Sequence, residues 1–229
     1  MNQRYTSLGK IFVRHFIRSI TCLLMVLCVS LPAYPFDSPL SDEAVREAYF
    51  LGQRHDASFL AKYIKFLPPP KTGPHISSIT FLTPFAQFAQ FSSNYVGNYS
   101  AQQALLDHRG HQEFVRITVE IYLTNSYGAL IPNPAATRSS SSPPLIPRHY
   151  DFWRDFRVQV SDGHQILSPS DSEGRPLYRC GRYGPCRPRG AAIDLEFPAS
   201  AFASDSITVE VTPPEGESVS VDFDLTRLR

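Results

Sequence analysis

The chain has 229 residues, of which 42% are hydrophobic, with 22 basic and 21 acidic residues and a net charge of +1. Its first 33 residues contain 4 basic and no acidic residues, so residues 34–229 carry 18 basic and 21 acidic residues, a net charge of −3. A nucleic-acid-binding face needs a surplus of basic residues to neutralise phosphates, so this balance disfavours a nucleic-acid partner.

The N-terminal segment has the charge order of a secretory signal. Four basic residues precede or flank the start of an apolar run over residues 20–31. As a helix this run spans about 18 Å, well short of the roughly 30 Å hydrocarbon core, which favours a cleaved signal peptide over residues 1–33. The alternative is an uncleaved anchor, in which Arg14 and Arg18 would lie in or near lipid at a cost of up to about 3 kcal/mol each. Membrane contact would then be confined to this segment.

Residues 34–70 predict a helical hairpin packed on the main domain. Ser41 can cap the free amides of a first helix, and Gly52 is a natural stop for it. Asp56 can cap a second helix, which the prolines at 68–70 would end because proline lacks the amide donor.

One stretch of this region carries a resemblance. The run LSDEAVREAYFLGQR over residues 40–54 resembles the mature start of a family of uncharacterised exported bacterial proteins. The resemblance implies export and brings no known activity with it.

From residue 71 onward apolar residues recur at every second position instead of at the three- and four-residue steps of a helix. This change predicts an antiparallel β-sandwich domain over residues 71–229. The clearest strand is 115–123, where apolar and polar residues alternate. Shorter strands are expected at 76–83, 156–160, 165–168, 193–197, 207–211 and 219–223. The Asp162-Gly163 pair predicts a tight hairpin, and the turn-rich segment 213–217 predicts another link between strands. Seven strands indicate a mainly β fold that is immunoglobulin-like in general type, although the Cys-Trp-Cys spacing of true immunoglobulin domains is not present.

Two irregular regions interrupt this pattern. Residues 131–147 contain five prolines and four consecutive serines, which predicts a disordered, exposed loop. Residues 85–110 predict a helical excursion, in which Ser100 and Gln103 resemble a capping box.

Cys180 and Cys186 are the cysteines that remain after residue 33. A pair separated by five residues in an exported chain predicts one disulfide and a periplasmic or extracellular location. Metal binding would require two further ligands at fixed spacing, and none lies beside this pair. His108 and His111 could also present imidazoles to a metal, but Gly110 interrupts the helix between them, so we expect a solvated turn, no metal site and no cofactor.

An aromatic and acidic segment is the first candidate binding surface. The single tryptophan, Trp153, lies between Asp151 and Asp155. Aromatic faces with carboxylates can hold a sugar, and paired carboxylates can catalyse glycosidic hydrolysis. The alternative is that Trp153 anchors the preceding loop to the core.

The second candidate surface surrounds the cysteine pair. Four arginines, Arg179, Arg182, Arg187 and Arg189, share this loop with three glycines. Guanidinium groups held on one disulfide-closed loop suit an anionic partner such as a phosphate, an acidic glycan or lipid headgroups, while the alternative is a solvated loop without a partner.

No local catalytic motif occurs in the sequence: there is no G-x-S-x-G, H-E-x-x-H, phosphate-binding loop or G-x-G-x-x-G. The sequence therefore indicates an exported binding or structural module of the cell envelope, whose partner is an envelope protein or an acidic glycan. The alternative function is an exported glycan-directed hydrolase that uses Asp151 or Asp155.

Overall fold

The computed structural model describes residues 35–95, 99–133, 135, 144–182 and 184–229. The predicted signal peptide and the centre of the predicted proline- and serine-rich loop lie outside these residues. Within the described ranges, no helix has the length and apolar character needed to cross a membrane.

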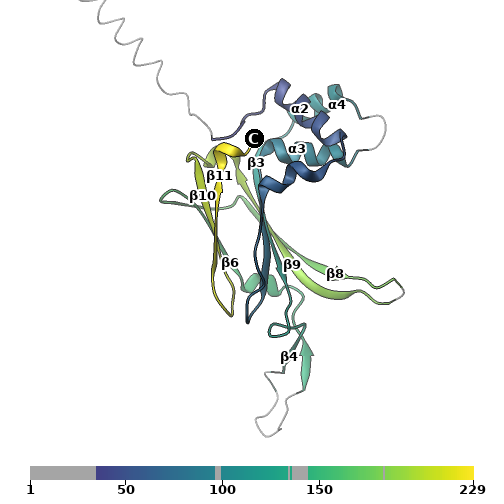
Figure 1. The fold of residues 1–229 in the computed structure, drawn as a ribbon, viewed down its shortest axis with the longest axis vertical. Helices are drawn as coiled ribbons and strands as arrows, with labels where there is room; N and C mark the ends of the chain where they lie inside the picture. The colour runs from purple at the N-terminus through teal and green to yellow at the C-terminus, as the bar shows by residue number, and fades with distance from the viewer. Residues whose placement is uncertain (1–34, 96–98, 134, 136–143, 183) are drawn as a thin grey trace, which may run out of the picture. The chain divides into compact units, whose positions relative to one another are not determined.

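The fold is mainly β and its sheets are antiparallel (Figure 1). The larger sheet has the order β1 (Ile64–Phe66), β2 (His75–Leu82), β3 (Phe114–Tyr122), β9 (Arg187–Pro198) and β8 (Asp171–Arg179). The second sheet has the order β11 (Val219–Asp224), β10 (Ser206–Thr212), β6 (Arg157–Asp162) and β7 (Gln165–Leu167). All seven predicted strands are confirmed, as are the hairpin at Gly163 and the turn-rich link between β10 and β11.

One hydrophobic core collects side chains from both larger sheets. The alternation predicted for β3 is confirmed: the side chains that face the core are fully buried, and those that face outward are partly exposed. Phe81 of β2 contacts Phe223 of β11 with ring centroids 5.6 Å apart, and Phe202 lies 5.5 Å from Phe81. These rings connect the two sheets through their facing sides.

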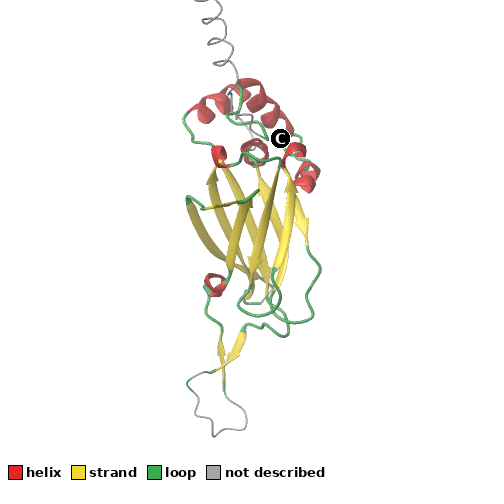
Figure 2. Ribbon diagram, turned by 90° about the vertical axis from the view of Figure 1, so that its left-hand side faces the viewer, coloured by secondary structure: helices red, strands yellow, loops and turns green. Residues whose placement is uncertain are grey.

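Three α-helices lie at one end of the strands (Figures 1 and 2): α2 (Asp42–Gln53), α3 (Pro84–Ser93) and α4 (Ala101–Arg109). Each begins at a hydroxyl cap, because Ser41, Thr83 and Ser100 accept hydrogen bonds from the backbone amides of their first turns. The helices share a second, smaller hydrophobic cluster. The helical excursion predicted between strands is therefore present as two helices.

The predicted N-terminal helical hairpin requires correction. Asp56 does act as a cap, but the segment that follows is a short 3-10 helix, η1 (Ala57–Tyr63), which runs directly into β1. The partner of α2 is α3, and Gly52 lies inside α2 where the two helices cross. A Cβ atom at Gly52 would overlap the carbonyl oxygen of Ala89, so this glycine allows close packing rather than ending the helix.

Several strands and short helices were not predicted from the sequence. β8 is a nine-residue edge strand, and β4 (Leu130–Pro132) pairs with β5 (Leu145–Pro147) at the two ends of the predicted disordered loop. Three further 3-10 helices are η2 (Phe152–Asp155), η3 (Ala199–Ala201) and η4 (Leu225–Arg227).

Candidate functional site

The β8–β9 hairpin forms an arm that extends past its neighbour β3 (Figure 1). Pairing between β9 and β3 ends at Gly190 and Tyr122, apart from one further bond in which the Leu123 amide donates to the Arg189 carbonyl. Beyond that point the strands pair only with each other, at Tyr178–Pro188 and Arg179–Arg187. We use the term basic arm for residues 174–193, of which residues 190–193 still pair with β3 and residues 178–189 extend past it.

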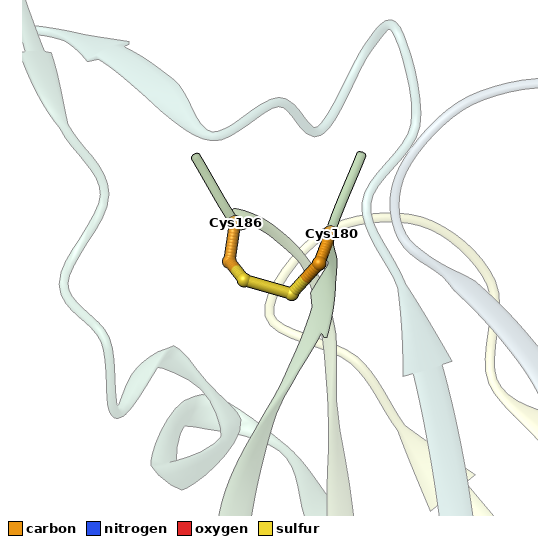
Figure 3. Close-up of a disulfide and its surroundings, with 2 residues drawn as sticks. All are labelled: Cys180 and Cys186. Atoms are coloured by element: carbon orange, nitrogen blue, oxygen red, sulfur yellow. A yellow bond between two sulfur atoms is a disulfide. The ribbon is translucent and has the colours of Figure 1, made fainter. Parts of the chain in front are cut away.

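A disulfide closes the tip of the basic arm. Cys180 and Cys186 are bonded, as the sequence predicted, and join the two strands just past their last pair (Figure 3). Because this loop is short and closed, it loses little conformational entropy when it binds a partner.

The charge of the basic arm has one sign. Residues 174–193 include five arginines and no acidic residue. Arg175 is offset by Asp194, with Nε 3.2 Å from Oδ2. Arg179 and Arg187 are exposed and face each other across the ladder, and neither forms an ion pair with any described residue. Two like charges held opposite each other repel, so an anion between them would relieve an unfavourable contact.

Arg189 has a different environment from the other arginines. The register shifts between Leu177 and Tyr178, which leaves Arg189 as the extra residue of a β-bulge. Its guanidinium lies 4.3 Å from the ring centroid of Tyr122, where it forms a cation–π contact. Burial, together with the Glu120 carboxylate to which the Tyr122 hydroxyl donates, raises the pKa of Tyr122. Through its contact with Tyr122 and the bond from the Leu123 amide, Arg189 attaches the base of the basic arm to the end of β3.

Trp153 packs against β8. A Cβ atom at Gly174 would overlap the indole ring, so the ring lies directly on the glycine backbone and contacts the main core. Asp151 accepts one hydrogen bond from His149 Nδ1 and forms an ion pair with Arg154 at 3.3 Å, and the bond from His149 lowers the pKa of Asp151. Asp155 is exposed at the end of η2. This arrangement favours anchoring over glycosidic catalysis, since Asp151 is held by its neighbours.

The helical end of the fold contains an apolar cavity that no sequence pattern predicted. It has a volume of about 340 Å³ and lies between α3, the end of α4 and the start of β3. Its apolar walls are Leu40, Pro84, Phe88, Phe91 and Phe114, and its ionisable residues are Asp107, His108, His111, Glu113 and Arg116. We call it the α3–α4 pocket.

Glu113 is the most highly bonded side chain of the α3–α4 pocket. One carboxylate oxygen accepts from the Leu40 amide at 2.6 Å and from His108 Nε2 at 3.0 Å, and the other accepts from the Ser38 hydroxyl at 2.8 Å. The Glu113 and His108 side chains are only 13% and 17% exposed. Glu113 therefore fastens the segment before α2 to the end of α4.

The two histidines considered for metal binding have other partners. His108 is bonded to Glu113, and His111 Nδ1 lies 2.5 Å from the backbone oxygen of Asp107. Nowhere in the described part of the chain do three or more metal-ligating side chains form a group. The spacing of Phe88 and Phe91 was visible in the sequence, but the contact of Glu113 with Leu40, 73 positions away, had no sequence signal.

Comparisons with known proteins provide no further guide. No protein-family model matches the chain, and no curated protein matches it significantly. The basic arm and the α3–α4 pocket are therefore the two candidate sites of this protein.

Proposed function

We propose that this protein is an exported binding module whose basic arm holds an acidic glycan of the cell envelope. The observation that carries the proposal is the basic arm, which has five arginines and no acidic residue and whose outer part extends past β3 to a disulfide at its tip. Of these arginines, Arg179 and Arg187 form no ion pair within the described residues, which leaves their donors for a partner.

The chemistry of the arm suits oxyanions on an extended chain. Guanidinium is planar and can donate two parallel hydrogen bonds to a carboxylate or sulfate. Tyr178 precedes Arg179 on β8, so its side chain lies on the opposite face of the hairpin, because successive side chains of a strand alternate. Its ring is 55% exposed and offers a flat apolar surface for the face of a sugar on that side of the arm. Because the disulfide restricts the tip, less conformational freedom is lost on binding.

We further propose that the fold is an antiparallel β-sandwich, immunoglobulin-like in general type. We also propose that the protein is exported and belongs to the family of uncharacterised exported bacterial proteins that residues 40–54 resemble. The shared core of the two larger sheets supports the sandwich. One disulfide is compatible with a periplasmic or extracellular location. The sandwich presents the basic arm as a continuation of two of its own strands, β8 and β9.

The proposal is tested with a double variant, Arg179→Gln/Arg187→Gln, and immobilised heparin and polygalacturonate as probes. We expect the native protein to bind both polyanions and to be released by salt, and the double variant to lose about tenfold or more in affinity. The matched control, Arg46→Gln/Arg54→Gln, removes the same charge from exposed positions at α2 and should change affinity by less than about twofold.

Three outcomes would contradict the proposal. The first is equal losses in the two double variants, and the second is binding that salt does not weaken. The third is binding to phosphatidylglycerol vesicles with no binding to either glycan, since the partner would then be a lipid surface.

A further inference from the structure

The α3–α4 pocket is a second site with a different chemistry from that of the basic arm. Its volume of about 340 Å³ lies within the range of roughly 300–1,000 Å³ that is usual for small-molecule sites. The Phe88 and Phe91 rings lie 6.2 Å apart, and Phe88 meets His108 edge to face at 5.8 Å. An apolar molecule would therefore find aromatic faces along one wall.

The charge that lines this pocket is predominantly negative. Asp107 and Glu113 contribute two carboxylates, and α4 ends beside them at Arg109, so the negative end of the helix dipole adds to the same sign. Arg116 is the opposing charge, but it is paired with Glu196 at 2.7 Å, outside the pocket lining. A cation is thus the ligand charge that the lining favours.

His108 lies in this lining with Glu113 as its hydrogen-bond partner. An ionised Glu113 has no proton to donate, so His108 Nε2 must donate the hydrogen bond of 3.0 Å between them. In the neutral ring the other nitrogen, Nδ1, is then an acceptor. An ammonium group can donate to such an acceptor and to the Asp107 carboxylate, which already accepts from Gln103 Nε2 at 2.7 Å and has further acceptor positions.

We propose that the α3–α4 pocket binds a protonated organic amine with a small apolar or aromatic body. Carboxylates attract its charge, and the faces of Phe88 and Phe91 stabilise a cation as well as its apolar body. The same walls would accept a neutral molecule of that shape with lower affinity, and the two carboxylates would repel an anion.

The experiment compares three probes that share one body: 2-phenylethylamine, 2-phenylethanol and phenylacetate. Isothermal titration of the purified protein should show the amine binding at least about tenfold more tightly than the alcohol, with no detectable binding of phenylacetate. Equal affinity for amine and alcohol, tighter binding of phenylacetate, or no binding of any probe would each overturn the proposal.

Two pocket variants and two matched controls locate the binding. Asp107→Asn should reduce the preference for amine over alcohol about fivefold or more, and Phe91→Ala should weaken both probes. Glu43→Gln and Phe50→Ala also remove one carboxylate charge and one phenylalanine ring, but at exposed positions of α2 outside the pocket, and should leave both affinities unchanged. Equal losses in pocket and control variants would overturn the assignment.

This test is independent of the proposed glycan function. The variant Arg179→Gln/Arg187→Gln should retain full amine binding, because the α3–α4 pocket includes neither residue. If that variant fails to bind amine while its circular dichroism is unchanged, the pocket assignment is wrong.

Discussion

Arg229 and Asp37 form an ion pair across 192 positions of the chain, with Nε 2.8 Å from Oδ2. The guanidinium of Arg229 also contacts the Glu47 carboxylate of α2 and lies 5.0 Å from the ring centroid of Phe85. Its bond to Asp37 is the main reason that the pKa of Arg229 is raised. The backbone oxygen of the same residue accepts from the Tyr63 hydroxyl at 2.8 Å, so one residue joins η1, α2, α3 and the segment before α2.

The first prediction concerns this junction. Arg229→Ala should lower the free energy of unfolding by about 1 kcal/mol, because half-exposed ion pairs contribute less than buried ones and are screened by salt. Urea denaturation at low and high salt measures this loss, which should shrink as salt rises. Arg227→Ala, at an exposed position two residues earlier, is the control, and an equal loss there would show that the ion pairs of Arg229 are not responsible.

A second prediction uses the contact of Trp153 with Gly174. Gly174→Ala places a methyl group inside the indole ring, and overpacking of this kind costs about 1–3 kcal/mol. In a Trp153→Ala background the same substitution should cost much less, since the ring has been removed. Circular dichroism during urea unfolding of the four proteins gives the coupling, and additive effects would contradict the contact.

The strands that the sequence revealed are those whose two faces differ. In β3 the inner side chains contact the core and the outer ones contact water, so apolar and polar residues alternate with a period of two in its sequence. β8 lacks this signature because it is a mostly exposed edge strand in which Gly174 and Pro176 occupy central positions. Gly174 there is required by Trp153, 21 positions away, and no local pattern predicts such a contact.

The same distinction explains the errors in the helical region. A helical face was predicted from apolar residues that recur at steps of three and four, namely Phe59, Leu60, Tyr63, Ile64 and Leu67. Instead η1 ends at Tyr63, because the next residues pair with β2 as β1. Gly52 looked like a helix stop because glycine ends many helices, whereas here the approach of α3 requires it. The basic arm was identified from composition alone, but the α3–α4 pocket depends on segments that only the tertiary fold brings together.

The third prediction concerns the disulfide. Cys180→Ser/Cys186→Ser should lower the free energy of unfolding by about 2 kcal/mol, since the bond closes a loop of seven residues in the unfolded chain. Thermal denaturation with and without reducing agent measures the change, and reduction of the native protein should reproduce it. A variant as stable as the oxidised protein would show that the bond does not constrain the unfolded state.

Alkaline pH supplies the fourth prediction. Burial, with the nearby Asp107 carboxylate, raises the pKa of Tyr99 to about 12, and burial also raises the pKa of Tyr63 and Tyr127. Phenols with raised pKa values hold their protons more tightly in the folded state than in the unfolded state, where the pKa is about 10. Their contribution to stability is therefore complete below about pH 10 and is lost as the pH rises through the folded pKa values.

Free energies of unfolding measured between pH 8 and 12 check this prediction. We expect a decline that begins near pH 10 and is shallower in Tyr99→Phe, because the variant has lost one of the phenols with a raised pKa. A constant free energy of unfolding over this range, or the same slope in the variant, would contradict it.

The last prediction concerns Glu113 as the fastener of the segment before α2. Glu113→Ala removes the acceptor of the Leu40 amide and of the Ser38 hydroxyl and leaves His108 without its partner. A buried donor left without an acceptor costs about 1–3 kcal/mol, so the variant should lose at least that much stability. Glu210→Ala, at an exposed position of β10, should lose less than about 0.5 kcal/mol.

Hydrogen exchange separates this local role from a general loss of stability. Because the Leu40 amide donates directly to Glu113, its exchange in Glu113→Ala should accelerate far more than that of Ile117 in β3, whose side chain is fully buried. Uniform acceleration at both amides would mean that the variant destabilises the whole domain, and unchanged exchange at Leu40 would mean that Glu113 does not hold this segment.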